Sequence, residues 1–187
     1  MVILLVILAL VVLYFVMTYN SLISIKNNVE KAWANINVLL KQRNDELPKL
    51  IDTCKIYMKH EAQTLENVTR ARMGADAARE THNIGALGAA ESALAASIGG
   101  LYAVAENYPD LKADQTFLNL QQRITGLENQ IADRREFYND SVNVSNVRVA
   151  QFPDLIVAKV FNFEPSELLK FAAEELKDID VSARFNA

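Results

Sequence analysis

An uncharged, apolar run at the start of the sequence constrains the fold more than any other feature. Residues 1–17 read MVILLVILALVVLYFVM, and the first charged residue is Lys26. The core of a lipid bilayer is about 30 Å thick and is crossed by roughly 17–25 apolar residues in a helix. Tyr14 and Tyr19 would lie at the membrane interface, where aromatic side chains gather. We therefore expect residues 1–25 to form a transmembrane anchor with a juxtamembrane segment, in contact with the lipid bilayer.

A cleaved signal peptide is the alternative interpretation of this run. A signal peptide needs basic residues before its apolar core and a small-residue cleavage site after it. The sequence has no Lys or Arg before the run, and the following VMTYNSLIS offers no such site. Lys26 and Lys31 outnumber Glu30 just beyond the run, and Lys and Arg beside a span stay on the cytoplasmic side. These charges predict a single-pass protein with its N-terminus outside and the bulk of the chain in the cytoplasm.

The rest of the chain has the hydrophobic period of α-helices. Apolar residues recur at steps of three and four over residues 22–68, 87–105 and 117–142. Pro48 interrupts the first stretch and predicts a kink or a short break there. Strand signals are negligible. We therefore expect an all-α fold, in which the transmembrane helix continues into an antiparallel up-and-down helical bundle over residues 26–163.

Two segments depart from ordinary bundle composition. Residues 85–100 are mostly Gly, Ala and Ser, which permits close approach by a neighbouring helix. That neighbour would lie within the same bundle or, alternatively, in another molecule of an oligomer. Residues 164–187 form an acidic tail, in which Pro165 and Ser166 predict the start of a short amphipathic helix.

Composition and motif spacing argue against several classes of function. The chain has 19 Lys+Arg against 23 Asp+Glu, so no basic excess favours nucleic acid as a partner. One cysteine and two histidines cannot build a Cys/His zinc cluster, and Thr64 stands where a zinc-protease helix starting at His60 needs its second histidine. Phosphate-binding and serine-hydrolase motifs are absent, and Cys54 lies on an apolar stripe. We therefore expect no enzyme activity, no cofactor, and no catalytic or metal-binding residue.

Two groups of residues are candidates for a role beyond the apolar core. The first comprises polar residues on or near the helical stripes, namely Arg43, Asn44, Glu106, Glu128, Arg134 and Asn139. They are expected to form a buried polar network that selects helix register, with a polar binding groove as the alternative. The second group is a candidate docking segment around the acidic tail, namely Phe163, Leu168, Leu169 and Phe171. This segment would bind a groove of a partner, or alternatively fold back on its own bundle.

The chain resembles the LemA family in three sequence blocks. The first block is residues 19–61, which begin YNSLISIKNNVEKAW, and the second is residues 105–146, which begin AENYPDLKADQTFLN. The third is FPDLIVAKVFNF at residues 152–163. The resemblance implies a bacterial source, a single-span anchor and a left-handed up-and-down helical bundle, and hence a place in the bacterial inner membrane. It implies no agreed biochemical activity and no catalytic residues.

These observations predict a membrane-anchored structural or scaffolding protein that acts by helix–helix association. The span and the small-residue helix favour self-assembly into a homo-oligomer. The alternative is an adaptor or binding module for another envelope protein, such as a protease or a sensor.

Overall fold

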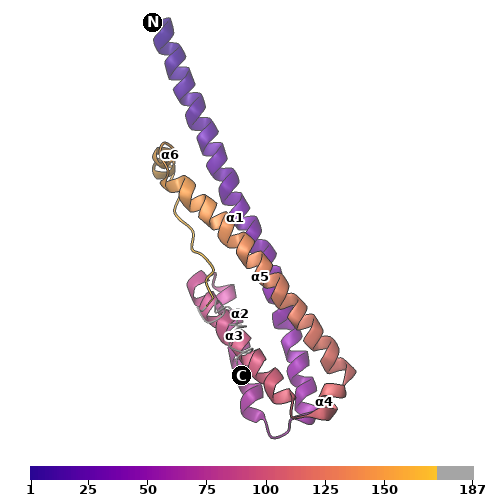
Figure 1. Ribbon diagram of the computed structural model, residues 1–187. Helices are drawn as coiled ribbons and strands as arrows, with labels where there is room; N and C mark the ends of the chain where they lie inside the picture. Colours follow the sequence, from indigo (N-terminus) through magenta and orange to yellow (C-terminus); the bar gives the residue numbers. More distant parts are fainter. Residues whose placement is uncertain (172–187) are drawn as a thin grey trace, which may run out of the picture. The chain divides into compact units, whose positions relative to one another are not determined.

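The computed structural model describes residues 1–171, and within them the chain is helical with no strand. The expected all-α fold with a long apolar N-terminal helix is therefore confirmed (Figure 1). The helices are α1 (Val2–Tyr57), α2 (Ala62–Glu80), α3 (Ile84–Ala105), α4 (Pro109–Ala113), α5 (Gln115–Ala150) and α6 (Asp154–Val160).

The chain divides into two compact units. Residues 1–43 and 125–168 form the first unit, and residues 44–124 form the second together with the described residues from Leu169 onward. Helices α1 and α5 therefore each supply residues to both units.

Helix α1 continues through Pro48 without a break and runs for 56 residues. An interior proline removes one backbone hydrogen bond and costs a helix about 3 kcal/mol. Leu47, Leu50 and Ile51 next to it are buried in the core of the second unit. Burial of each such side chain contributes about 1.5–3 kcal/mol, so local packing outweighs the cost of the proline.

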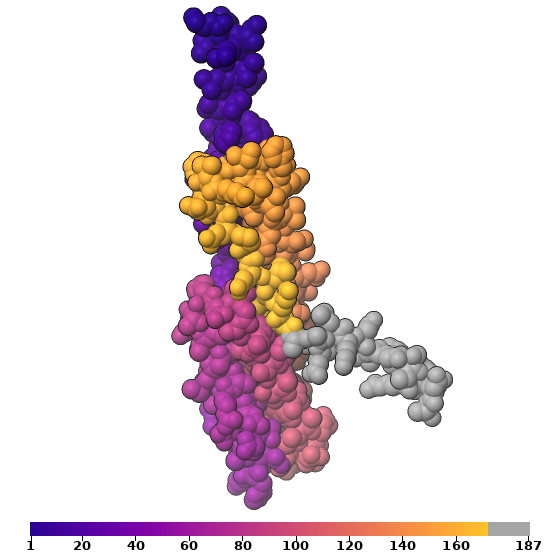
Figure 2. Space-filling model, turned by 90° about the vertical axis from the view of Figure 1, so that its left-hand side faces the viewer, coloured from indigo at the N-terminus to yellow at the C-terminus, as the bar shows by residue number. Residues whose placement is uncertain are grey.

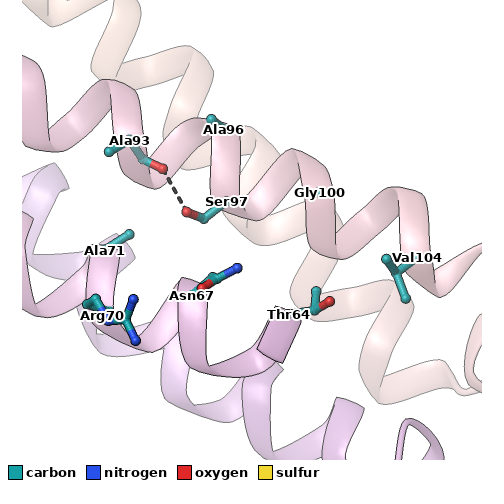
Figure 3. Close-up of a pocket in the computed structure, with 9 residues that line it drawn as sticks. All are labelled: Thr64, Asn67, Arg70, Ala71, Ala93, Ala96, Ser97, Gly100 and Val104. Carbon is teal, nitrogen blue, oxygen red and sulfur yellow. Dashed lines mark hydrogen bonds between the residues drawn. The ribbon is translucent and has the colours of Figure 1, made fainter. Parts of the chain in front are cut away.

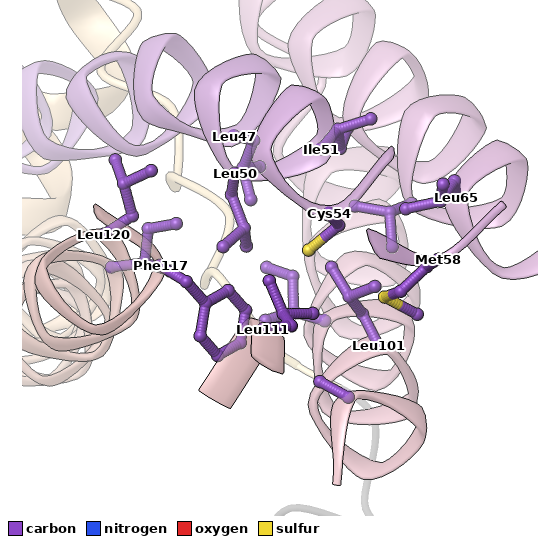
Figure 4. Close-up of a cluster of buried hydrophobic side chains, with 14 of the residues drawn as sticks. Leu47, Leu50, Ile51, Cys54, Met58, Leu65, Leu101, Leu111, Phe117 and Leu120 are labelled. Atoms are coloured by element: carbon purple, nitrogen blue, oxygen red, sulfur yellow. The ribbon is translucent and has the colours of Figure 1, made fainter. Parts of the chain in front are cut away.

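The core of the second unit is made by the end of α1 together with α2, α3, α4 and the start of α5 (Figure 4). Its largest buried side chains include Leu47, Leu50, Met58, Leu101, Leu111 and Ile124. Two helix starts in this unit carry side-chain caps. Asn83 accepts a hydrogen bond from the Ala86 N–H, and Asp114 accepts one from the Phe117 N–H, each at 2.9 Å. Asn and Asp are among the residues most favoured at helix N-caps, because their side chains satisfy a backbone N–H of the first turn.

The first unit buries the stripe of α1 that follows the apolar run, along with the second half of α5. These buried residues are Leu22, Val29, Ala32, Ile36 and Leu40 from α1, and Leu127, Ile131, Tyr138, Val142 and Val149 from α5. Trp33 makes an edge contact with Tyr138, with ring centroids 5.9 Å apart. The steps of three and four between these residues are those on which the helix prediction rested.

The helix predicted to start at Ser166 does not form, because residues 162–171 are not helical. The side chain of Asn146 in α5 forms hydrogen bonds with both the N–H and the carbonyl of Ser166. Its Oδ1 accepts from the Ser166 N–H at 2.9 Å, and its Nδ2 donates to the Ser166 carbonyl at 3.0 Å. The Tyr138 hydroxyl donates to the Glu167 carbonyl at 3.0 Å. The Ser166 and Glu167 carbonyls are acceptors that the first turn of a helix would use, so these bonds compete with helix formation. The rest of the predicted tail, residues 172–187, lies outside the described residues.

Candidate functional site

The apolar run of α1 is exposed along its whole length. Every residue from Met1 to Met17 is exposed, whereas Thr18 is buried. Figure 2 shows this part of α1, in indigo, standing clear of the orange end of α5 in the same unit. The segment is long and apolar enough to cross a membrane. A continuous apolar surface of this extent is far larger than soluble proteins expose. The protein is therefore membrane-associated through this segment.

Helix α3 also meets the length and composition of a membrane span, but it differs from α1 in its packing. Leu94, Ile98 and Leu101 of α3 belong to the core of the second unit, whereas every residue in the apolar run of α1 is exposed. Helix α3 is therefore a core helix of its unit that keeps a large exposed face.

A polar stripe on α1 lies where the exposed apolar run ends. Tyr14, Thr18 and Ser21 share one helix face, and two of them bond to an ion pair of the same unit. The Tyr14 hydroxyl donates to Asp154 Oδ1 at 3.4 Å, and Arg148 Nη2 donates to Ser21 Oγ at 3.2 Å. Arg148 Nε lies 2.6 Å from Asp154 Oδ2, although its N–H does not point at that oxygen. The stripe ties α6 and the end of α5 to α1.

Aromatic rings reinforce this attachment. The ring of Tyr19 lies 4.6 Å from that of Phe161 and 6.0 Å from that of Phe163, measured between centroids. A small buried cluster of Leu22, Val149, Val157 and Ala158 lies beside them. Helix α6 is therefore fixed against residues 14–22 of α1.

The second unit has a groove between α2 and α3, with a volume of about 570 Å³ (Figure 3). Its lining is Thr64, Asn67, Arg70 and Ala71 from α2, and Ala93, Ala96, Ser97, Gly100 and Val104 from α3. The only charged side chain in this lining, Arg70, forms an ion pair with Glu66 at 2.7 Å. The groove therefore offers mainly short side chains and helix backbone.

The exposed residues of α3 are all glycine or alanine. They are Gly85, Ala86, Ala89, Ala93, Ala96, Gly99, Gly100 and Ala103. A Cβ added at Gly99 or Gly100 would meet nothing within 4 Å. Gly88 is different, since a Cβ there would lie 2.0 Å from the carbonyl oxygen of Lys170. Close packing against the Lys170 backbone therefore explains why position 88 requires a glycine. The Gly/Ala face of α3, in contrast, is open among the described residues.

A family comparison covers most of the sequence. The model of the LemA family matches residues 32–183. The chain belongs to the LemA family. Among curated proteins, this LemA-family chain is similar to Protein LemA of Metamycoplasma hominis, with 27% identity over 167 residues that cover 87% of this chain and 74% of that protein.

Two magnetosome proteins are also similar to this LemA-family chain. MamQ 1 and MamQ 2 of Paramagnetospirillum magneticum are each 23% identical to it over 177 residues, covering 81% of this chain. The match covers 64% of the length of each MamQ protein.

The six residues predicted to form a polar network differ in their burial in this LemA-family protein. Arg43 is buried, and Asn44, Glu128 and Asn139 are half-buried. Glu106 and Arg134, however, are exposed, and Glu106 pairs with Lys112 at the surface. The exposure of Glu106 and Arg134 does not fit a buried network, which stays a prediction for the other four residues.

A buried carboxylate that sequence reasoning missed is Glu46. Its side chain is 7% exposed and lies 3.0 Å from both Lys49 Nζ and Arg123 Nη2 in the second unit. The spacing of Glu46 and Lys49 on one helix is an ordinary surface pattern, so it gave no signal of burial.

The residues of the candidate docking segment do not share one exposed surface. Leu169 is fully buried, Leu168 is exposed, and Phe163 and Phe171 are half-buried. Phe163 packs against Tyr19 in the first unit. The positions of Phe163 and Leu169 agree better with the alternative, in which this segment folds back on its own bundle, than with an exposed docking peptide.

Two tyrosine–carboxylate hydrogen bonds link the connections of the second unit. The Tyr57 hydroxyl donates to Asp114 at 2.9 Å, and the Tyr108 hydroxyl donates to Glu61 at 3.1 Å. The bond to Asp114 raises the pKa of Tyr57, and burial followed by the bond to Glu61 raises that of Tyr108. The Phe117 N–H, with help from Tyr57, lowers the pKa of Asp114. These groups hold helix ends together.

Among the described residues, no group of three or more His, Cys, Asp or Glu side chains is arranged to hold a metal ion. Cys54 is fully buried, as its place on the apolar stripe predicts.

We expect Cys54 to be almost unreactive in the folded protein. Burial raises the pKa of its thiol from 9.0 to about 11, which lowers the thiolate fraction about a hundredfold at neutral pH. Reaction with a disulfide reagent should be at least that much slower in the native protein than in guanidinium. Equal labelling rates in both states would contradict the burial of Cys54.

The raised pKa of Cys54 also predicts a pH dependence of stability. Because the pKa of the thiol is higher in the folded state than in the unfolded state, the free energy of unfolding should fall as the pH rises from about 9 to 11.

Proposed function

We propose that this protein is a membrane-anchored scaffold that assembles by helix–helix association between copies of the chain and has no catalytic activity of its own. The apolar run of α1 would hold it in the inner membrane of a bacterium. Lys26 and Lys31 favour an outside N-terminus and a cytoplasmic body.

The observation that carries this proposal is the Gly/Ala face of α3. A helix that is apolar enough to cross a membrane exposes only glycine and alanine, beside a groove lined mainly by short side chains. Small residues let two helix backbones approach closely, which increases the dispersion contacts between them. An anchor confines copies to one plane and brings such faces together at high local concentration. A second copy of α3 is therefore the simplest occupant of this face.

Native mass spectrometry of the full chain in lipid nanodiscs tests the proposal. We expect a uniform homo-oligomer for the wild type. Gly100→Leu should shift the distribution to monomers, with association at least about tenfold weaker, because a Cβ at this position meets nothing within 4 Å among the described residues, whereas a leucine side chain would block close approach by another helix.

The matched control is Gly126→Leu in α5, where an added Cβ also meets nothing within 4 Å. This variant lies outside the α3 face and should assemble like the wild type. A wild-type chain that is monomeric at all concentrations would overturn the proposal. A monomer that carries a second envelope protein would favour the adaptor function instead, although the burial of Leu169 removes part of the docking segment expected for it.

A further inference from the structure

We propose that α6 and the aromatic residues at its ends insert into the membrane interface beside the span of α1, as a second lipid contact of this chain. The inference rests on the proposed anchoring by α1 and adds a lipid-binding surface outside residues 1–25. It needs no assembly of copies.

The surface consists of large apolar side chains that are exposed around α6. Phe152 is 74% exposed, Ile156 46%, Val160 65% and Phe161 52%. Ile156 and Val160 are one helical turn apart, so they share a face of α6, while Phe152 and Phe161 flank the helix. The opposite face is buried in the first unit through Asp154, Val157 and Ala158. Helix α6 therefore packs one face against its unit and keeps a second, apolar face uncovered among the described residues.

The position of α6 along α1 indicates that lipid covers this face. The Tyr14–Asp154 hydrogen bond and the Tyr19–Phe161 ring contact place α6 beside the end of the exposed apolar run. A bilayer core about 30 Å thick corresponds to roughly 20 residues at 1.5 Å each. Counted from the start of the run, the boundary of the core falls near Asn20. Figure 1 shows that α1 continues alone beyond α6 toward the N-terminus. By this count residues 14–19 of α1 lie within about 9 Å of the core boundary, so the geometry sets α6 where the hydrocarbon meets the lipid headgroups.

The polar chemistry around α6 agrees with this position. A carboxylate next to hydrocarbon is tolerated when it is paired. Asp154 meets this condition, since it accepts from Tyr14 and lies 2.6 Å from Arg148. Lys159 is exposed on the same helix, where its stem can lie along the apolar surface while its ammonium reaches lipid phosphates. An apolar face edged by a cation is typical of interfacial helices.

Fluorescence quenching in the full chain tests the inference. Ile156→Cys and Val160→Cys variants are labelled with an environment-sensitive fluorophore and placed in phosphatidylcholine–phosphatidylglycerol nanodiscs containing nitroxide-labelled lipid. The wild type, whose one thiol is buried, serves as the labelling blank. We expect quenching by shallow nitroxides at both positions, about threefold or more above that at Phe137→Cys, a site on α5 with similar exposure.

A third label separates failure of this inference from failure of the anchor. Leu10→Cys lies in the middle of the apolar run and should be quenched by deep nitroxides if α1 spans the bilayer. Quenching at Leu10 with Ile156 and Val160 no different from Phe137 would overturn the inference and leave the anchor intact. No quenching at Leu10 would overturn the anchor, and with it the basis of the inference. Circular dichroism melts confirm that each labelled variant is folded.

Discussion

Gly88→Ala is expected to lower the free energy of unfolding by about 1–3 kcal/mol, although alanine is the better helix former. A Cβ at this position would lie 2.0 Å from the Lys170 oxygen and 3.0 Å from its carbonyl carbon. Both atoms belong to the backbone, so no side-chain rotation relieves the clash. The neighbouring Leu169 is fully buried, and a shift of this segment would expose it. Denaturation followed by circular dichroism in mild detergent measures the effect.

The matched controls for Gly88 lie on the same helix. Gly99→Ala and Gly100→Ala place a methyl group in open space, so each should raise the free energy of unfolding by about 0.5–1 kcal/mol. The opposite signs separate the close approach at Gly88 from the general effect of alanine on a helix. A stabilising Gly88→Ala would show that residues 169–171 do not pack against α3.

Arg148→Leu is expected to destabilise the first unit by about 2 kcal/mol. The substitution leaves the Asp154 carboxylate, whose side chain is 12% exposed, without its cation. Removal of one member of a fully buried ion pair costs about 3–5 kcal/mol. The Arg148 side chain is 36% exposed, so solvent screening reduces that cost. Thermal melts of the full chain in nanodiscs provide the measurement.

A second substitution distinguishes the charge from the packing of Arg148. Adding Asp154→Asn to Arg148→Leu removes the unpaired carboxylate and should recover about half of the lost stability. Arg134→Leu is the control on α5, since Arg134 is exposed and its loss should change stability by less than about 0.5 kcal/mol. If Arg148→Leu behaves like Arg134→Leu, the ion pair does not hold α6 in place.

Features that depend on local sequence were predictable. The helical stripes, the burial of Cys54 and the cap at Asp114 follow from the spacing and type of nearby residues. The apolar run of α1 follows in the same way. The hydrogen bonds of Tyr14 and Ser21 do not follow from local sequence, because their partners lie more than a hundred positions away.

Features that depend on distant residues were not predictable. Ser166 is a residue type typical of a helix N-cap. Its backbone instead forms two hydrogen bonds with the side chain of Asn146, and no helix starts there. Pro48 predicts a kink or a short break, and the burial of its neighbours explains why the helix continues through it. Glu106 lies near an apolar stripe, yet its place at the end of α3 exposes it. At Pro48 and Ser166, contacts with distant residues outweigh a local preference worth at most about 3 kcal/mol.

The Gly/Ala face of α3 has a consequence for the thermodynamics of any association through it. Glycine and alanine have no side-chain rotamers to order, so contact through this face would proceed without the entropy loss that long side chains impose. For each residue, the gain in dispersion energy and the loss of conformational entropy would then both be small. Affinity would depend on the straightness of two helix backbones over several turns, because a gap of even 1 Å forfeits a large part of the dispersion attraction.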